Sequence, residues 1–365
     1  MNNKRLFMDI HAIQTLPPSN INRDDTGSPK TAQYGGIRRA RVSSQAWKRA
    51  IRQYFNLQGE QFKVGVRTKD IVNYVANKVM VLDANISLEQ AVAGAEKAIN
   101  NAGISTKDHM AKALFFLGDK QAEELAKAVI AGKTEKGDRK YLQEILANNP
   151  EIDIALFGRM VADAPELNTD ASCQVAHAIS THAVQTEFDY FTAMDDLTPE
   201  DQTGAGMLGN IEYNSSTLYR YADIAVHDFK KQLGNKETAI AACKLFIEAF
   251  SNSLPTGKVN TFANQTLPSL IMVTLRADRP VSLVSAFEKP VKADHGNGYI
   301  DASIETMADE YVKSMKFVSE PVANFYVKVA GQKLTDQLGE ESKNLNALLE
   351  AVGEEIDKYF EEAGE

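Results

Sequence analysis

The stretch Gly35–Phe55, GGIRRARVSSQAWKRAIRQYF, constrains this chain more than any other part of it. It carries Lys or Arg at 6 positions and no acid, although the 365-residue chain has a formal net charge of −9. Residues 1–55 hold ten Lys/Arg and three Asp, a net charge of +7 that leaves −16 on the remainder. Basic charge confined to one part of an acidic protein indicates an anionic partner at one surface, and a polyphosphate backbone is the natural candidate.

The same stretch also has a readable shape. Arg39 and Arg41 alternate with small apolar residues, so they share one face of a predicted short strand. Ser43 and Ser44 then offer a helix N-cap. The helix expected over 44–56 has a buried stripe of Trp47, Ile51 and Phe55. Lys48 and Arg52 form a basic row beside this stripe, with Arg49 nearby. Because helix N-termini bind phosphate, this charge distribution favours an anion site over the alternative of a solvated basic face.

Periodicity along the rest of the chain predicts an α+β fold. Strands are expected at 5–14, 152–160, 184–194, 212–226, 270–277 and 281–291, and a long loop at 15–34. Helices are expected at 44–56, 171–183, 236–253, 300–316 and 341–362, and nearly throughout 66–147, including 110–118. Strands flanking helices, with a helical insertion after the first helix, are compatible with a ferredoxin-like core.

Seven segments in a fixed order resemble the CasC family, the CRISPR-RNA-binding backbone subunits of the type I-E Cascade surveillance complex in bacterial antiviral defence. The segments are NINRDD (20–25), YGGIRRARVSSQAWKRAIR (34–52), DIALFGRM (153–160), VAHAISTHAV (175–184), FDYFTAMDDL (188–197), LYRYADI (218–224) and AFEKPVKA (286–293). The resemblance runs from about residue 5 to about residue 320 and is weak through 56–150. It implies a discontinuous RRM-like palm over 1–57 and 151–365, helical fingers over 58–150 and a β-hairpin thumb over 195–212 within the palm.

The resemblance also implies a noncatalytic filament subunit that orders a guide RNA and leaves most of its bases free for pairing. Its implied partners are the CRISPR RNA, target DNA, other Cascade subunits and further copies of itself stacked head to tail, typically six in the family. The residues expected to hold guide phosphates are Arg23, Lys30, Arg39, Arg41, Ser43, Gln45, Lys48, Arg49, Arg52, Lys258, Lys289 and Lys292. Asp294 stands where the family has a further lysine.

Two further sets of residues follow from the same resemblance. Met160, Phe191 and the neighbouring Thr192 would lie against the guide where a nucleotide is kinked out, because an apolar wedge unstacks bases without sequence preference. From the residues alone, Met160 and Phe191 would be read as core positions. In the fingers, a basic cluster is expected to track duplex DNA, with a solvated helix entry as the alternative: Lys133, Lys136, Arg139 and Lys140.

Other chemistry is weakly supported by the sequence. Asp24, Asp25 or Asp195 would be the candidates if the chain were instead a metal-dependent endoribonuclease, but such acidic pairs more often cap turns. Gly204–Gly209 matches a dinucleotide-binding motif without the flanking strand and helix that the motif needs. His177 is expected to be a partly buried helix residue. We therefore predict no catalytic residue, no metal and no cofactor.

Compartment is predicted from what the sequence lacks. The chain has only two cysteines, Cys173 and Cys243, and neither lies in a CxxC motif, which is typical of a reducing cytoplasm. No apolar run approaches the ~20 residues that a membrane-spanning helix needs. We therefore expect a cytoplasmic protein with no membrane partner.

Overall fold

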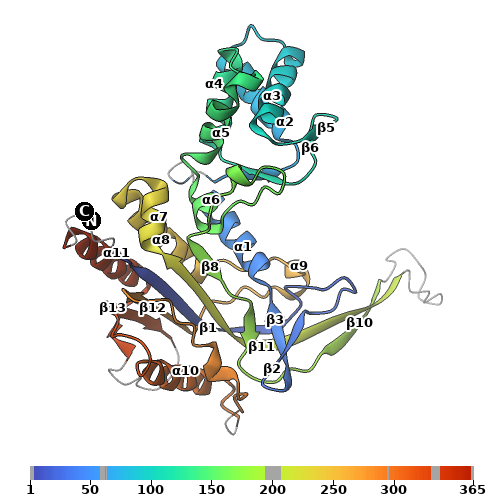
Figure 1. Ribbon diagram of the computed structural model, residues 1–365. Coiled ribbons are helices and arrows are strands. Elements are labelled where there is room, and N and C mark those ends of the chain that lie inside the picture. The colour runs from blue at the N-terminus through green and yellow to red at the C-terminus, as the bar shows by residue number, and fades with distance from the viewer. Residues whose placement is uncertain are drawn as a thin grey trace, which may run out of the picture. The chain divides into compact units, whose positions relative to one another are not determined.

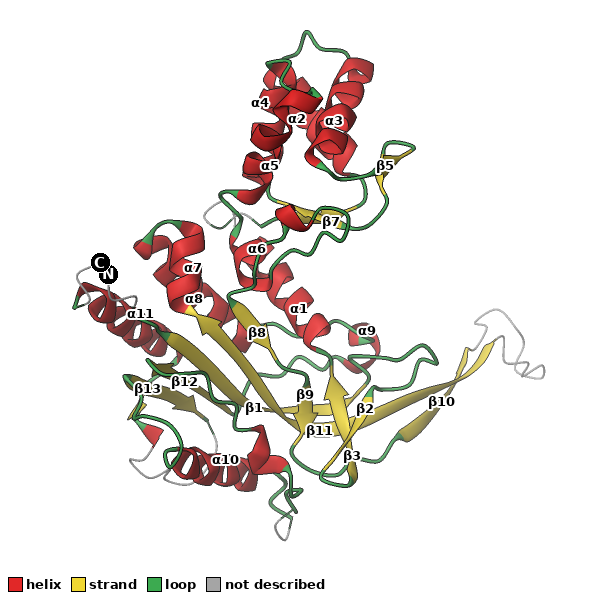
Figure 2. Ribbon diagram, viewed as in Figure 1, coloured by secondary structure: helices red, strands yellow, loops and turns green. Residues whose placement is uncertain are grey.

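The computed structural model describes residues 4–57, 62, 64–193, 207–293, 296–329 and 338–362. The chain divides into two compact units, both discontinuous in sequence. The helical unit contains residues 1–5, 52–174 and 224–245, and the sheet unit contains residues 6–51, 175–223 and 246–365. The fold is mixed α/β and contains one large mixed sheet together with helices in both units (Figure 2). The boundaries proposed for palm, fingers and thumb stay a prediction.

The sheet unit is built on a ten-stranded sheet that runs in the order β14-β13-β12-β1-β11-β9-β3-β2, with β8 and β10 also paired to β11 (Figure 1). The strands are β1 (Phe7–Ser19), β2 (Thr31–Tyr34), β3 (Ile37–Val42), β8 (Cys173–Val175), β9 (Ala178–Ser180), β10 (Glu187–Ala193), β11 (Met207–Ala225), β12 (Leu270–Arg276), β13 (Ala323–Lys328) and β14 (Glu340–Glu341). β1 is buried along almost its whole length, because it lies between β12 and β11 and is covered on both faces. β12 pairs antiparallel with β1 and with β13, so the centre of the sheet is a continuous antiparallel ladder.

Helices pack against this sheet on two sides. They are α1 (Ser44–Leu57), α8 (Lys236–Asn252), α9 (Val259–Phe262), α10 (Ile300–Ser314) and α11 (Leu345–Glu361), with a 3-10 turn, η4 (Val284–Phe287). One core lies under α10 and includes Tyr219, Phe287, Ile304 and Met307. A second core surrounds Trp47 of α1. The predicted stripe of Trp47, Ile51 and Phe55 is buried, which confirms the helical periodicity of this segment.

The helical unit has a core of its own. Its helices are α2 (Ile71–Leu82), α3 (Leu88–Ala102), α4 (Asp119–Ile130), α5 (Arg139–Ala147), α6 (Ile152–Phe157) and α7 (Val226–Leu233), with the 3-10 turns η2 (Lys136–Asp138) and η3 (Pro165–Leu167). It also contains β4 (Val66–Thr68), β5 (Thr106–Lys107), β6 (Met110–Ala111) and β7 (Phe115–Leu117). Ala91, Ala95, Ala98 and Ala102 form a fully buried small-residue face of α3 in the core that α2 to α5 share. Ser87 and Gln90 close a capping box at the start of α3.

Four sequence-based expectations of element type are wrong, and the bounds of a fifth segment change. Residues 152–160 form α6 rather than a strand, because Ile152, Ile154, Ala155 and Leu156 are all buried and a short, wholly buried segment has no diagnostic period. Residues 171–183 contain β8 and β9 rather than a helix, since both strands pair with β11. Segment 110–118 contains β6 and β7, and segment 281–291 contains η4 rather than a strand. The predicted loop 15–34 is shorter at both ends, because β1 runs to Ser19 and β2 begins at Thr31.

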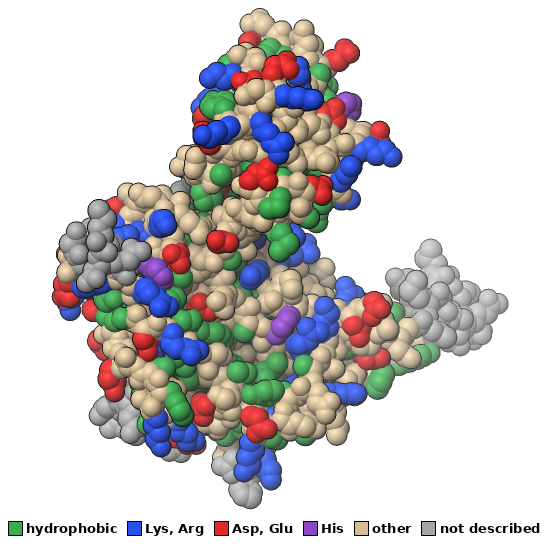
Figure 3. Space-filling model, in the orientation of Figure 1, with side chains coloured by type: hydrophobic (Ala, Val, Ile, Leu, Met, Phe, Trp, Pro, Cys, Tyr) green, Lys and Arg blue, Asp and Glu red, His purple; other side chains and the backbone are tan. Residues whose placement is uncertain are grey.

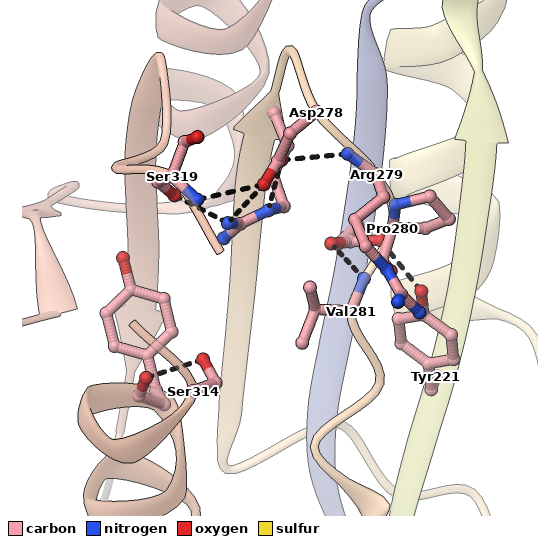
Figure 4. Close-up of polar contacts among 10 residues, drawn as sticks. Tyr221, Asp278, Arg279, Pro280, Val281, Ser314 and Ser319 are labelled. Atoms are coloured by element: carbon pink, nitrogen blue, oxygen red, sulfur yellow. Dashed lines mark hydrogen bonds and ion pairs between the residues drawn. The ribbon is translucent and has the colours of Figure 1, made fainter. Parts of the chain in front are cut away.

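The segment that follows β12 is held by buried polar groups of the sheet (Figure 4). The Asp278 carboxylate accepts hydrogen bonds from Arg276 and from the Ser319 N–H. Asp9 of β1 accepts from the Tyr221 hydroxyl at 2.8 Å and from the Val281 N–H at 2.9 Å. These bonds fix the start of the segment that carries Lys289 and Lys292.

Candidate nucleic-acid interface

The β2–β3 hairpin carries the first arginines of the basic stretch. Its two-residue turn, Gly35–Gly36, has positive φ at both positions, which is the geometry of tight hairpins. A Cβ at Gly35 would lie 1.7 Å from the Glu288 carbonyl oxygen, so the turn sits directly against the segment that precedes Lys289. Glycine is therefore required here for both conformation and space.

Arg39 does not lie on the surface as the sequence predicts. Its side chain is 0% exposed, and its guanidinium donates to the carbonyl oxygens of Phe287 at 2.7 Å and Ser180 at 3.1 Å. The planar, multi-donor guanidinium suits this bridging of strand β9 to the η4 segment. In this fold Arg39 positions the η4 segment and does not face solvent.

Arg41 and Lys30 lie partly exposed beside the start of α1. The Arg41 Nε donates to the Thr31 carbonyl at 3.2 Å, and the backbone N–H of Arg41 donates to the Lys30 carbonyl at 2.9 Å. Both cations lower the pKa of His177, after the larger effect of burial. The structure thus brings these two predicted residues together.

Several backbone N–H groups at the start of α1 have partners within the protein. The Ser43 N–H donates to Asn22 Oδ1 at 2.8 Å, and the Ser44 N–H donates to His177 Nδ1 at 3.1 Å. Ser43 also caps the helix, since its Oγ accepts from the Ala46 N–H at 3.4 Å. His177 lies exposed between β8 and β9, so the expectation of a partly buried helix residue is wrong.

The residues of the basic row along α1 differ in their exposure and in their partners. Gln45 and Arg49 are exposed and Lys48 is half-buried. Arg52 belongs to the helical unit and has partners there. Its Nε pairs with the fully buried Asp153 at 2.8 Å, and its guanidinium lies 4.4 Å from the Phe116 ring centroid. Arg52 therefore supports its own unit rather than offering a free charge.

The acidic candidates lie in an exposed turn. Asp24 Oδ1 accepts from Thr26 Oγ1 at 2.7 Å and from the N–H groups of Thr26 and Ser28. The Thr26 hydroxyl is the main cause of its lowered pKa, and the backbone N–H groups add to it. Arg23 and Asp25 are exposed in the same turn, while Asp195 lies outside the described residues. Across the residues that the structure describes, no group of three or more His, Cys, Asp or Glu could hold a metal ion.

Both predicted apolar contacts are exposed. Met160 is 86% exposed and Phe191 is 39% exposed, and Thr192 beside it is exposed as well. Phe191 lies on β10, which pairs antiparallel with β11 in a two-stranded ribbon (Figure 1). The connection 194–206, which contains most of the expected thumb and half of Gly204–Gly209, lies outside the described residues.

The structure also describes three further lysines that were predicted to contact the guide. Lys289 and Lys292 are exposed and line a groove of about 550 Å³ together with residues of α10, Lys313 among them. Lys258 is half-buried in a left-handed conformation at the start of α9. Asp294 lies outside the described residues.

Sequence reasoning missed three exposed side chains of this unit. Arg38 is exposed while Arg39 is buried, and the alternation of a strand could have shown that the two face opposite ways. Phe188 and Tyr190 of β10 are 67% and 62% exposed. The two residues are two positions apart, so β-strand periodicity alone indicates that both lie on one face of the ribbon.

The sequence model of a family described as CT1975-like protein matches residues 8–351. The chain belongs to this family.

Solved structures agree over the same length. The CT1975-like chain superimposes on a chain of a structure described as "CRISPR RNA-guided surveillance complex, pre-nicking", with a TM-score of 0.83 and 32% identity over 96% of this chain and 100% of the other. A second match, described as "CRISPR RNA-guided surveillance complex", has a TM-score of 0.73 and 28% identity over 95% and 99% of the two chains. Comparison with curated proteins gives no match. The resemblance to a CRISPR protein is thus confirmed.

The helical unit of this CT1975-like chain carries the cations predicted to meet DNA. Lys133, Lys136, Arg139 and Lys140 are all exposed. Arg139 pairs with Glu166 at 2.9 Å, Lys140 lies 3.9 Å from Glu144, and the Lys133 ammonium lies 4.7 Å from the Tyr141 ring centroid. Figure 3 shows both signs of charge intermingled over the α2–α5 bundle. Exposed pairs of this kind are weak and leave the cations able to exchange partners.

No helix within the described ranges is both long and apolar enough to cross a membrane.

Proposed function

We propose that this chain is the CRISPR-RNA-binding backbone subunit of a type I-E Cascade surveillance complex. It polymerises along the guide RNA and presents the guide for pairing with invading DNA in antiviral defence. The observation that carries this proposal is the likeness over nearly the whole of both chains to a component of a CRISPR RNA-guided surveillance complex. Its site of action is the cytoplasm, and its partners are the guide, target DNA, further copies of itself and other Cascade subunits.

The charge distribution supports phosphate contacts in the sheet unit. Exposed or partly exposed cations of the β2–β3 hairpin, its neighbouring loop and α1 lie close along the chain: Arg23, Lys30, Arg38, Arg41, Lys48 and Arg49. They belong to a protein whose net charge is −9, so they are not part of a general excess of basic charge. Contacts to phosphate and sugar position a strand without reading its sequence. That property suits a guide whose sequence varies.

The other predicted residues take secondary places in this proposal. Gln45, Lys258, Lys289 and Lys292 extend the phosphate contacts, and Met160, Phe191 and Thr192 contact bases. Arg39, Ser43 and Arg52 act through the elements that they hold in place, because their polar atoms are bound within the protein. The basic cluster of the helical unit, Lys133 to Lys140, contacts target DNA in this proposal.

Copurification tests the proposal most directly. The full chain is expressed with the products of its neighbouring genes and with a CRISPR array, and the nucleic acid bound after purification is sized. RNA of one uniform length is expected. A variant with Lys48→Ala and Arg49→Ala should yield less RNA of the same length. Purified protein with no RNA, or with RNA of random length, would contradict a backbone role.

We also propose that the subunit is noncatalytic. Asp24 is occupied in a turn, as the bonds to Thr26 and Ser28 show. The test is incubation of the RNA-loaded protein with Mg²⁺, for the wild type and for Asp24→Asn, Asp25→Asn and Asp195→Asn. Intact RNA is expected in every case. Cleavage by the wild type that any of these variants abolishes would establish the endoribonuclease alternative instead.

A further inference from the structure

A pocket of about 390 Å³ lies in the sheet unit at the base of the β10–β11 ribbon. Its walls come from β1, the β9–β10 connection, β11 and the residue before α10: Thr15, His182, Gln185, Ser215, Thr217 and Tyr299 among others. Its volume is within the range of small-ligand sites. None of the residues named so far for RNA contact lines it.

Hydrogen bonds fix the ring of His182 in this pocket. Its Nε2 accepts from the Thr217 backbone N–H at 3.0 Å, so that nitrogen carries the lone pair. Its Nδ1 lies 2.8 Å from the Ala183 carbonyl oxygen, and it therefore carries the proton and donates. Burial is the main cause of the lowered pKa of His182. The imidazole is consequently held as one neutral tautomer in one orientation.

Tyr299 lies flat on this imidazole. The two ring centroids are 3.7 Å apart and the planes differ by 7°. Tyr299 is half-buried, so His182 covers one face of the phenol ring and leaves part of the side chain accessible at the pocket. A rigid, partly exposed aromatic ring is the surface on which nucleic-acid-binding proteins stack bases.

The rest of the lining selects for a neutral, hydrogen-bonding ligand. Thr15 and Thr217 share a hydroxyl hydrogen bond of 2.9 Å, and Ser215 and Gln185 add polar groups. Glu187 is the one charged residue among the described residues of the lining, so the pocket does not suit a phosphate. A nucleobase has a planar face for the ring and a polar edge for hydroxyl and amide groups.

The pocket is joined to the lysine segment of the proposed interface. The Val291 N–H donates to the carbonyl of Thr181, the residue before His182, at 2.9 Å. Ser303 of α10 donates to the Thr181 hydroxyl at 2.8 Å. Phosphates held at Lys289 and Lys292 would therefore place a strand beside this pocket.

We propose that the pocket binds one base of the guide RNA, stacked on Tyr299. The inference rests on the proposed RNA-binding function and adds to it a base-binding site separate from Met160 and Phe191. Stacking on Tyr299 requires no particular base, because every base has a π-face. Polar groups of the pocket then hold the base edge.

A double comparison tests this site. The full chain is titrated with a fluorescein-labelled single-stranded RNA and with an oligomer of the same length in which every base is replaced by an abasic site. For the wild type, the base-bearing oligomer should bind more tightly. Tyr299→Ala should weaken base-bearing RNA about five-fold or more and leave abasic binding unchanged, whereas Tyr299→Phe should behave as wild type.

A second variant guards against a folding defect. Ser215→Leu fills the pocket from β11 and leaves the Tyr299–His182 stack in place, and it should give the same selective loss. Equal losses for both oligomers, or no loss in either variant, would overturn the pocket while leaving RNA binding intact. A normal RNA affinity with impaired self-association would show that the pocket receives a second copy of the chain and would also overturn it. A wild type that binds neither oligomer would instead refute the proposed function.

Discussion

Phe191 of β10 lies directly over Gly209 of β11. The two residues are cross-strand partners in the ribbon, and a Cβ at position 209 would lie 2.4 Å from Phe191 Cζ. An aromatic ring that covers a cross-strand glycine is held against the ribbon by that contact. Gly209 thus sets the direction of the aromatic base contact that is predicted on this strand.

Gly209→Ala should therefore impair RNA binding through Phe191. The added methyl displaces the ring, and the loss should approach that of Phe191→Ala, ~1–3 kcal/mol of stacking per base. Asn210→Ala, the neighbouring exposed position opposite Tyr190, is the matched control and should change affinity little. Gly209→Ala in a Phe191→Ala background should add nothing. An additional loss in the double variant would show that Gly209 acts independently of the ring.

Lys48→Ala with Arg49→Ala should weaken RNA binding to the same degree for different sequences. Each phosphate contact that is lost reduces counterion release, so the log–log salt dependence should become shallower by ~1–2. The measurement is a titration of two unrelated RNAs at several salt concentrations. An unchanged slope in the folded double variant would show that this helix face is ordinary solvated surface.

Arg52→Ala should instead destabilise the protein. It leaves the Asp153 carboxylate, which is 0% exposed, without its cationic partner, although the Gly65 N–H still donates to it at 2.9 Å. Removing one partner of a buried ion pair costs ~3–5 kcal/mol, and the 22% exposure of Arg52 places the expected loss near the lower value. Chemical denaturation measures it.

Asp153→Asn gives the matched control for that pair. In an Arg52→Ala background it removes the uncompensated charge while its amide oxygen still accepts from Gly65. The double variant should therefore be more stable than Arg52→Ala alone. A double variant that is less stable by the sum of both single losses would contradict an ion-pair role.

The local shape of the basic stretch was predictable because its signals are local. Trp47, Ile51 and Phe55 follow a helical period, and Ser43 supplies a cap. Charge alone could not reveal that Arg39 and Arg52 face inward, since their partners lie far away in sequence: Phe287 and Ser180 for Arg39, and Asp153 for Arg52. A cation's role depends on whether the fold offers it a carbonyl or carboxylate partner, and no residue pattern near Arg39 encodes those partners.

The predicted secondary structure was wrong where pairing with distant strands determines whether a segment is a strand or a helix. Ala178–Ser180 became a strand because β3 and β11 flank it, although its composition suits a helix equally well. The stack of Tyr299 on His182 joins positions more than a hundred residues apart, so sequence spacing could not suggest it. Distant pairs of this kind define the proposed base pocket.

Asp9 lies buried in β1 among Tyr221, Asp223, Arg276 and the Val281 N–H. Burial is the main cause that raises its pKa from 3.8 to about 7, partly offset by the hydrogen bonds from Tyr221 and Val281. Burial also raises the pKa of Asp223 to about 6. Between pH 3.8 and about pH 7, the folded chain binds a proton at Asp9 that the unfolded chain releases. The stabilisation of the folded chain by this bound proton is therefore complete below pH 3.8 and is lost as the pH rises through about 7.

Asp9→Asn isolates that contribution, because the amide cannot titrate. At pH 5 the substitution should destabilise the protein by ~1–3 kcal/mol, since one of the two bonds to Tyr221 and Val281 loses its acceptor. At pH 8 the wild type has had to ionise a buried carboxyl, so the difference between the two proteins should shrink or change sign. Chemical denaturation at both pH values measures this difference, and Asp25→Asn in the exposed turn is the control for the same substitution at a surface carboxyl. A difference between wild type and Asp9→Asn that stays constant from pH 5 to pH 8 would show that Asp9 does not carry a proton in the folded chain.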